Sequence, residues 1–319
     1  MIPDINLKDG IHIPADTVKG LLWGGVESGI RWLEHLPAIL DQLCQKHEIT
    51  DLRPSPEIRM NLVLFGESAT HGPVVLKLAQ PHWEATNEIT ALRILGKTGH
   101  YAPLIDADVA GAWSLQERIQ PGEMLQTFAQ SGEVSDEKAT QITAGLMRAT
   151  ASPVPSDTPH LFPDLNRWLR SLWEYAASGR DEIPPDQVEL AIRYARDLIA
   201  HPAPAMLLHG DFHHGNILKG EVDWVIIDPK GIQAELAFEV GPFFYNPIGV
   251  DKRPNLVEVF DRRLSIFSQE LGIDRIRLWR CALIACVLSD CWSLEEGPVN
   301  HVHFNTVTAA LMQLPDRNA

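Results

Sequence analysis

The sequence predicts an α+β fold in two parts, a strand-rich amino-terminal part and a larger, mostly helical carboxy-terminal part. Its 319 residues are enough for two lobes that each bury a core. Apolar and β-branched runs gather before Pro121, whereas apolar residues at three- and four-residue intervals dominate after Gly122. The Pro121-Gly122 pair itself predicts a turn, so we place the boundary between the two parts there.

The first part begins with an amphipathic helix over residues 28–47, because Leu33, Leu36, Leu40 and Leu43 form one apolar stripe. The runs RMNLVLFGE and GPVVLKLAQ then predict an antiparallel hairpin. A helix is expected over WEATNEITALRILGKTG, with glycines as its stop signals. LIDADVAG and WSLQERI complete this part as two short strands.

The second part is mostly helical in pattern. One apolar stripe contains Leu165, Trp168, Leu169, Leu172 and Trp173, and QVELAIRYARDLIAH forms another. VDWVIIDPKG predicts one buried strand that ends in a turn, and the remainder to LMQL is again helical. We therefore expect a helical lobe interrupted by one loop and one strand, without internal repeats.

The charge balance disfavours nucleic acid as a partner. Lys and Arg total 27 against 42 Asp and Glu, and the net charge of −15 repels a phosphate backbone. The acidic balance either keeps the protein soluble or attracts a cationic substrate, and the sequence leaves both interpretations open. No basic leader and no run of about 18 apolar residues is present, so a cytoplasmic protein without membrane contact is expected.

The four cysteines predict buried, reduced core residues rather than a zinc site or a disulfide framework. Three of them, Cys281, Cys286 and Cys291, follow one another at intervals of five residues, which do not share one helical face. No C-x-x-C pair occurs in the chain.

The segment LLHGDFHHGNIL, residues 207–218, is the most distinctive stretch. Its three histidines and Asp211 are metal-ligand types, but a structural zinc site usually draws ligand pairs from two distant segments. A catalytic loop fits better, because Asp211 and Asn216 have the spacing of the base and the magnesium ligand in the H-R-D-x-x-x-x-N loop of kinases. Asp228 ends the strand that follows and supplies a second oxygen ligand of the kind that Mg²⁺ prefers.

Phosphoryl transfer also needs a cation for the phosphates, and Lys77 in VVLKL is the candidate. A lysine among apolar residues of a strand is costly unless its charge is paired. Glu88 in the next helix is the favoured partner, and Glu84 is the alternative. The preceding turn FGESATHG, with Gly66 and Gly72, could cover phosphate with backbone N–H groups, although such glycines are most often simple turn residues.

Together these segments resemble the aminoglycoside phosphotransferases, a branch of the protein-kinase-like superfamily. The segments NLVLFG, PVVLKL, EITALR, ERIQPG, HGDFHHGNIL, IDPKG and VLSDCWSLEEG are similar, in this order, to streptomycin 6-phosphotransferases and hydroxyurea phosphotransferases, over residues 60–297. The resemblance implies a bilobal kinase-like fold, with an N-lobe at 1–116, a hinge at 117–123 and a helical C-lobe at 124–319. It implies ATP and Mg²⁺ as cofactors.

The resemblance also assigns roles to residues. Asp211 would be the catalytic base, and Asn216 and Asp228 would bind magnesium. Lys77, oriented by Glu88, would hold the nucleotide phosphates. The turn residues themselves, rather than the resemblance, place Gly66 in the phosphate-covering turn. The backbone of Glu117 and Ile119 would contact adenine in the hinge. His209 would be a buried, hydrogen-bonded loop residue, and His213 would be part of the loop scaffold.

The expected activity is transfer of phosphate to a hydroxyl group of a small molecule, either an aminoglycoside of the streptomycin type or hydroxyurea. A cationic acceptor would suit the acidic and aromatic end of the late helix, which carries Asp290, Trp292, Glu295 and Glu296. An exposed acidic helix end would look the same. Two alternatives remain: a kinase of a metabolic amino alcohol or sugar, and a non-catalytic nucleotide-binding protein. The oligomeric state is not indicated by the sequence.

Overall fold

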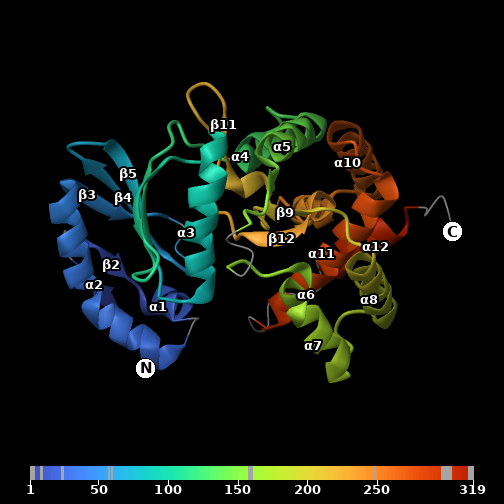
Figure 1. Ribbon diagram of the computed structural model, residues 1–319, viewed down its shortest axis with the longest axis horizontal. Helices are drawn as coiled ribbons and strands as arrows, with labels where there is room; N and C mark the ends of the chain where they lie inside the picture. The colour runs from blue at the N-terminus through green and yellow to red at the C-terminus, as the bar shows by residue number, and fades with distance from the viewer. Residues whose placement is uncertain are drawn as a thin grey trace. The chain divides into compact units, whose positions relative to one another are not determined.

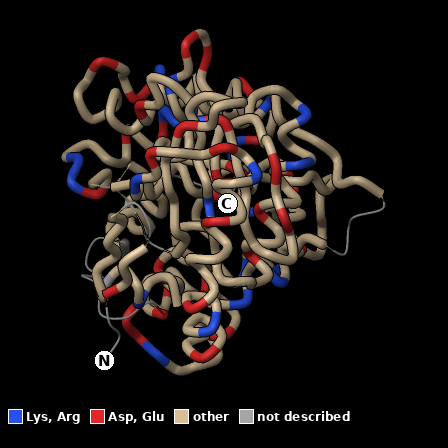
Figure 2. Tube along the Cα trace, turned by 90° about the vertical axis from the view of Figure 1, so that its left-hand side faces the viewer, with Lys and Arg blue, Asp and Glu red and all other residues tan. Residues whose placement is uncertain are grey.

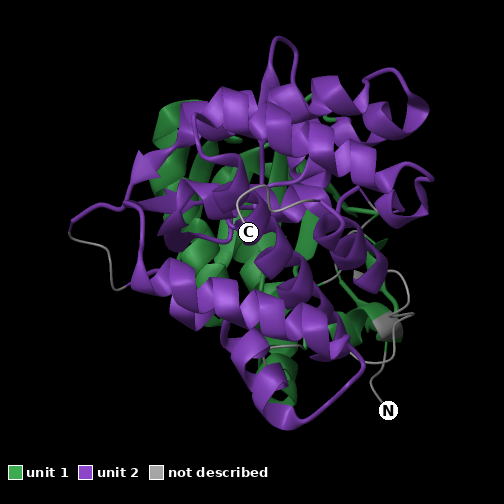
Figure 3. Cartoon of the chain, turned by 90° about the vertical axis from the view of Figure 1, so that its right-hand side faces the viewer, with its two compact units in different colours: residues 1–122 green, residues 123–319 purple. Residues whose placement is uncertain are grey.

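The computed structural model describes residues 4–7, 10–22, 25–56, 58, 60–156, 161–247, 249–295 and 304–314. The chain divides into two compact units, residues 1–122 and residues 123–319, coloured separately in Figure 3. The division falls within the segment 117–123, whose role as a hinge remains a prediction. Each unit is described by itself below.

Unit 1 is built on a five-stranded antiparallel sheet with the strand order β3-β4-β5-β7-β6. A two-stranded ribbon, two helices and a third helix between strands complete it (Figure 1). The elements are β1 (Ile5–Asn6), β2 (His12–Ile13), α1 (Ala15–Leu21), α2 (Val26–His47), β3 (Ile49–Pro54), β4 (Leu62–Ser68), β5 (Gly72–Leu78), α3 (Trp83–Leu95), the 3-10 helix η2 (Gly96–Thr98), β6 (Leu104–Asp108) and β7 (Trp113–Glu117).

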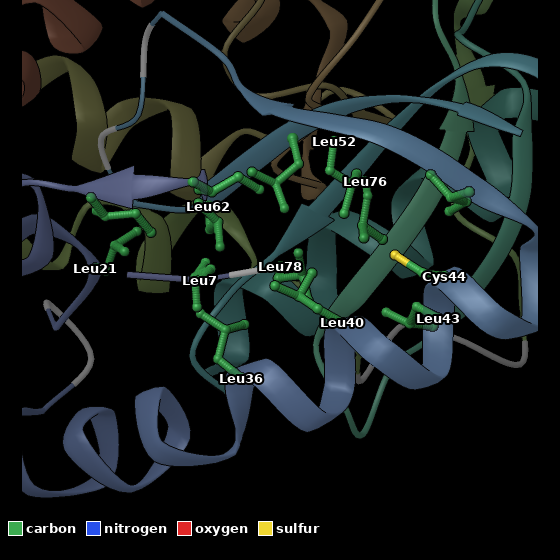
Figure 4. Packing of buried hydrophobic residues seen from close by; sticks show 14 of the residues in the cluster. Leu7, Leu21, Leu36, Leu40, Leu43, Cys44, Leu52, Leu62, Leu76 and Leu78 are labelled. Carbon is green, nitrogen blue, oxygen red and sulfur yellow. The ribbon is translucent and has the colours of Figure 1, made fainter. Parts of the chain in front are cut away.

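The core of unit 1 lies between α2 and one face of the sheet. The predicted leucine stripe supplies Leu36, Leu40 and Leu43, which point toward Leu76 and Leu78 of β5 (Figure 4). Alternate residues of a strand face opposite sides of a sheet. Lys77, between these two leucines, therefore faces away from α2.

Unit 2 is mostly helical, and its centre is α11. Its elements are α4 (Leu125–Ser131), α5 (Asp136–Thr150), β8 (Ser152–Pro153), α6 (Leu165–Trp168), α7 (Arg170–Ser178), α8 (Pro185–Ala200), β9 (Ala205–Leu208), η3 (His214–Asn216), β10 (Ile217–Lys219), β11 (Trp224–Ile226), β12 (Ile232–Glu235), η4 (Leu236–Val240), α9 (Gly241–Phe244), η5 (Val250–Lys252), α10 (Leu256–Leu271), α11 (Arg275–Glu295) and α12 (Phe304–Met312).

Helix α11 is buried on nearly all sides from Leu278 to Cys291, because α7, α8, α9, α10 and α12 pack around it (Figure 1). A helix that is apolar all round belongs in the centre of a domain. All four cysteines are buried, as predicted. None of the described helices is both long enough and apolar enough to cross a lipid bilayer.

Unit 2 also contains more strand than the sequence indicated. The single strand expected in VDWVIIDPKG is only the three residues of β11, which pairs with β10, and β12-β9-β8 form a second small sheet. The predicted strand is cut short because Asp228 has φ +59°, a left-handed conformation that ends the ladder. The other strands are two to four residues long, too short to give a clear alternation.

Candidate active site

The loop between β9 and β10 carries Asp211, and the hairpin β10–β11 brings the other two predicted ligands together. Ile217 pairs with Ile226, and the backbone N–H of Ile227 donates to the carbonyl of Asn216 at 3.0 Å. This register places Asn216 beside the end of β11, where Asp228 follows at once. A non-glycine residue with positive φ is uncommon and often marks a functional constraint.

Hydrogen bonds inside the loop fix the Asp211 side chain, which is 31% exposed. The amide Nδ2 of Asn216 donates to the Asp211 carbonyl at 2.9 Å and lies 3.4 Å from its Oδ2. His213 Nε2 lies 3.5 Å from the Asp211 Oδ1. Burial acts to raise the pKa of Asp211, but His213, Lys230 and His209 outweigh it and hold the pKa well below its usual range. The carboxylate is therefore ionised at neutral pH.

His209 is buried and hydrogen-bonded, as expected. Its Nε2 donates to the carbonyl of Ile227 at 2.8 Å, and its Nδ1 accepts the backbone N–H of Asp211 at 3.1 Å. Burial lowers the pKa of His209 to about 4, against smaller opposing effects that include nearby Asp211. A neutral ring satisfies both contacts at pH 7, so His209 ties the loop to the end of β11.

Glu239 is a site residue that the sequence reasoning missed. Its side chain is buried, and its two carboxylate oxygens accept the backbone N–H groups of His209 and Gly210 at 2.8 and 2.9 Å. Burial raises the pKa of Glu239 to about 7, although both hydrogen bonds act to lower it. The signal in the sequence is a glutamate inside the apolar run LAFEVGPFF, where a carboxylate needs a specific partner.

A second missed feature is a buried ion pair behind the loop. The Arg263 side chain is fully buried and donates to Asp136 at 2.6 Å and to the carbonyls of Phe243 and Asn246 at 2.6 and 3.0 Å. The guanidinium lies over the Phe243 ring, which stacks on the imidazole of His214 with 3.9 Å between centroids. Arg263 thus stabilises the loop through Phe243, which contacts His214.

The three loop histidines do not converge on one point. His209 is bonded to the β11 end, His213 accepts the N–H of Gly215 and approaches Asp211, and His214 is buried against Phe243. In the described parts of the chain, no group of three His, Cys, Asp or Glu side chains is arranged to hold a metal ion. The three imidazoles therefore engage different partners.

In unit 1, Lys77 and Glu88 form the predicted ion pair. Lys77 Nζ lies 2.6 Å from the Glu88 Oε1, and both side chains are 9% exposed. The lysine leaves β5 on the face opposite the leucine core, and Glu88 comes from the buried side of α3. The structure therefore supports Glu88, rather than the alternative Glu84, as the partner chosen from the sequence.

The prediction that Gly66 lies in the turn is wrong. Gly66 is inside β4, opposite Val74 of β5, and the turn is confined to residues 69–71. A β-carbon on Gly66 would lie 2.7 Å from Ile49 Cγ2 and 3.2 Å from the Thr50 carbonyl. The glycine is required because β3 passes too close for a side chain, so packing rather than turn geometry explains it.

The predicted hinge residues begin at the end of the last ladder of unit 1. Glu117 ends β7, and its N–H donates to the Pro103 carbonyl at 3.0 Å, whereas the N–H of Arg118 donates to Pro73 at 2.9 Å. The Arg118 guanidinium covers the Phe65 ring at 4.3 Å. Ile119 comes directly after this anchored pair. Contacts of this backbone with a nucleotide remain a prediction.

The four acidic and aromatic residues proposed for the acceptor differ in their surroundings. Asp290 is buried, with 3% of its surface exposed. Trp292 is half-buried and packs edge-on against Trp168, with ring centroids 5.4 Å apart. Glu295 is exposed at the last position of α11, and Glu296 lies outside the described residues. Asp290 alone therefore differs from an ordinary exposed helix end.

Asn216 and Asp228 fit a magnesium ion by the chemistry of their donor atoms. Mg²⁺ takes oxygen ligands, including one or two carboxylates, with phosphate oxygens and water completing its shell. The Asn216 amide nitrogen is engaged with Asp211, which leaves its carbonyl oxygen as the ligating atom. Asp228 supplies a carboxylate at the same end of the hairpin.

Solved structures with this fold include several small-molecule kinases. A choline kinase of Streptococcus pneumoniae matches with a TM-score of 0.61 at 10% identity, covering 88% of this chain and 100% of that one. A thermostable mutant of an aminoglycoside phosphotransferase, in complex with ADP and hygromycin B, matches with a TM-score of 0.60 at 13% identity. The match covers 86% of this chain and 98% of that one. These similarities confirm the bilobal protein-kinase-like fold, with an antiparallel sheet in one unit and helices in the other.

Curated relatives match over most of the chain. The streptomycin 6-kinase of Streptomyces glaucescens is 28% identical over 302 residues, which is 90% of this chain and 92% of the relative. The streptomycin 3''-kinase of Klebsiella pneumoniae is 30% identical over 230 residues, 70% of this chain and 81% of the relative. The hydroxyurea phosphotransferase of Kitasatospora aureofaciens is 28% identical over 302 residues, which is 91% of this chain and 82% of the relative.

A family model described as aminoglycoside/hydroxyurea antibiotic resistance kinase matches residues 53–297. This match includes the Lys77–Glu88 pair, the Asp211 loop and the end of β11. The resemblance inferred from the sequence is confirmed, and the chain belongs to the aminoglycoside/hydroxyurea antibiotic resistance kinases, a family of small-molecule kinases.

Proposed function

We propose that the protein transfers the γ-phosphoryl group of ATP, in the presence of Mg²⁺, to a hydroxyl group of a streptomycin-type aminoglycoside or of hydroxyurea. The observation that carries the proposal is the ionised Asp211 carboxylate, fixed by Asn216 and His213 on a loop whose neighbouring hairpin end bears Asp228. A base held in one orientation beside a pair of oxygen ligands is what phosphoryl transfer requires.

In this mechanism Asp211 orients the acceptor hydroxyl and accepts its proton. A carboxylate with a low pKa suffices, because in a loose transition state the proton can leave late. Asn216 and Asp228 would hold magnesium, which neutralises charge on the phosphates when bound. The fixed geometry of Asp211 thus contributes orientation more than basicity.

The nucleotide is assigned to residues of unit 1. Lys77, held by Glu88, would neutralise phosphate charge, and the backbone at Glu117 and Ile119 would contact adenine. Lys77 already carries a buried partner, so its ammonium is pre-oriented and little side-chain entropy remains to be lost on binding. Gly66 would act indirectly, by allowing β3 and β4 to approach closely.

The acceptor class follows from the relatives and from charge. The curated relatives are named for streptomycin and for hydroxyurea. Acidic residues outnumber basic ones by 42 to 27 and are distributed along the trace (Figure 2), which favours a cationic acceptor such as an aminoglycoside. We propose a small cationic or hydroxylated acceptor, with no nucleic acid as partner.

The test is ADP release from Mg-ATP with streptomycin, other aminoglycosides, hydroxyurea, choline and small sugars as acceptors. The wild type should turn over streptomycin or hydroxyurea. Asp211→Asn should reduce kcat by about 100-fold or more, with ATP affinity kept, since the substitution removes the proton acceptor but little of the nucleotide contact.

Either of two results would refute the proposal. One is turnover of choline or a sugar in place of both named acceptors, which would move the enzyme to the metabolic alternative. The other is near-normal turnover by the Asp211→Asn variant, which would remove Asp211 from the chemistry.

A further inference from the structure

Asp290 is an unusual carboxyl group in the centre of unit 2. It lies in the last part of α11, a helix whose other buried residues are nearly all apolar, and only 3% of its surface is exposed. Neither carboxylate oxygen has a hydrogen-bond partner among the described residues. A buried polar group without a partner is destabilising, so its presence calls for an explanation.

Other buried acidic residues in the described parts of the chain all have partners. Glu88 pairs with Lys77, Glu235 pairs with Arg277, and Glu239 accepts two backbone N–H groups. Asp290 is the exception. An apolar residue at this position would pack in the interior without the cost of burying an unpaired carboxyl group. This contrast indicates that the carboxyl group serves something other than the fold.

Helix α11, which bears Asp290, is connected to the catalytic loop through the short helix η4. Cys286 lies one helical turn before Asp290 on the same face. Helix α11 packs against η4, and Glu239 of η4 accepts the backbone N–H groups of His209 and Gly210 at 2.8 and 2.9 Å. The helix that carries Asp290 is therefore joined to the loop of Asp211 through Glu239.

The close packing of α9 on α11 fixes this arrangement. A β-carbon on Gly241 would lie 2.3 Å from the β-carbon of Ala285, so the two helices touch at the shortest distance that glycine permits. The position of α9 against α11 is thus set by backbone contact rather than by a flexible side chain.

We propose that Asp290 binds the cationic group of the acceptor, and so selects acceptors with an amino or guanidino group over neutral ones. This inference rests on the proposed function and deepens it by naming the acceptor class. A cation brought to Asp290 meets an unpaired carboxyl group in a low-dielectric environment, where an ion pair is strong. Burial raises the pKa of Asp290 to about 8, which keeps the side chain uncharged until a cation arrives.

The test compares the wild type, Asp290→Asn and a control, Glu174→Gln, on streptomycin and on hydroxyurea. Glu174 is an exposed acidic residue of α7, with 64% of its side chain accessible. In Asp290→Asn, the KM for the polycation streptomycin should rise about 30-fold or more, because one partner of a buried charge pair is lost. The hydroxyurea KM and the control variant should stay within about twofold of wild type.

Two kinetic outcomes would overturn the proposal. An unchanged streptomycin KM in Asp290→Asn would show that the carboxylate does not bind the acceptor. An equal loss on both acceptors, together with a lower melting temperature, would show a structural role instead.

Calorimetry gives a readout that does not depend on turnover. Streptomycin binding at about pH 7, measured in two buffers of different ionisation enthalpy, should release about one proton from wild type and none from Asp290→Asn, because the carboxyl ionises as it pairs. If wild type phosphorylates neither acceptor, the proposed function fails while this result still supports the role of Asp290. Equal binding and equal proton release in both proteins, or no binding to wild type, would overturn it.

Discussion

The buried carboxylate of Glu239 accepts the backbone N–H of His209 at 2.8 Å and so fixes the start of the loop that carries Asp211. Its second oxygen accepts the N–H of Gly210 at 2.9 Å. The backbone N–H groups of His209 and Gly210 lie beyond the end of β9 and are not paired in a sheet. One side chain from a different segment accepts both of them. The position of Asp211 depends on this contact.

Replacement of Glu239 by Ala should lower both stability and turnover. The two N–H groups would lose their acceptors, at about 1–3 kcal/mol each. We expect the free energy of unfolding, measured in urea, to fall by about 2–6 kcal/mol. Glu239→Gln, which keeps one acceptor oxygen, should lie between Ala and wild type. Equal unfolding curves for Ala and wild type would contradict the role given to Glu239.

The ion pair of Lys77 and Glu88 allows stability and function to be separated. Lys77→Met leaves Glu88 buried without its 2.6 Å partner and should cost about 3–5 kcal/mol in unfolding free energy. The double variant with Glu88→Leu should recover much of that stability, because an apolar pair replaces a buried ion pair well.

Turnover should not recover in the Lys77→Met, Glu88→Leu double variant, since the phosphate-binding cation is still missing. Urea unfolding and ADP release on the same preparations decide this. Recovery of activity along with stability would show that Lys77 is only structural.

Arg263 should be among the most sensitive positions of unit 2. Arg263→Met leaves Asp136 with Arg253 as its remaining ion-pair partner among the described residues, and the carbonyls of Phe243 and Asn246 lose a donor. The expected loss is about 3–5 kcal/mol, because a buried charge pair is broken. Arg262→Met, at a partly exposed neighbour, is the matched control and should cost less than about 1 kcal/mol. Similar losses of unfolding free energy in Arg263→Met and Arg262→Met would show that the buried ion pair of Arg263 does not stabilise unit 2.

The contact of Gly241 with Ala285 predicts a rescue. Gly241→Ala places two β-carbons 2.3 Å apart, so α9 must move away from α11. Such overpacking costs about 1–3 kcal/mol. Adding Ala285→Gly removes the opposing methyl group and should restore most of the loss in melting temperature and in activity. A double variant as unstable as the sum of the single ones would refute the contact.

Asp290 predicts a specific pH dependence of stability. Its pKa is raised from the ordinary 3.8 to about 8 by burial, so between these values the folded chain holds a proton that the unfolded chain has lost. Stability of the wild type therefore falls as pH rises through this window, whereas Asp290→Asn lacks this loss.

The melting temperature of Asp290→Asn should exceed that of wild type by a margin that grows from about pH 5 to about pH 8. Glu239, whose pKa is also raised, contributes equally to both proteins and cancels in the difference. Parallel melting curves over this pH range would be inconsistent with a buried, unpaired Asp290.

The sequence alone determined the elements whose signal is local. The leucine stripe of α2 and the apolar alternation of β4 and β5 reflect burial of one face, which a period of 3.6 or 2 residues records directly. The spacing of Asp211 and Asn216 and the lysine inside VVLKL indicated the chemistry, because few structural roles account for a charged residue in a strand core. The resemblance to the kinase family followed from the same segments.

The tertiary structure alone decided contacts between segments that lie far apart in the chain. Sequence periodicity cannot report that Glu239 reaches back to His209 or that Arg263 spans Asp136 and α9. It also assigned Gly66 to a turn, because close passage of β3 leaves no local signal. The sequence also could not distinguish Asp290 from an exposed helix end, since the helices that cover it come from other segments. Burial and pairing are properties of the packed chain, and packing is what the sequence pattern does not contain.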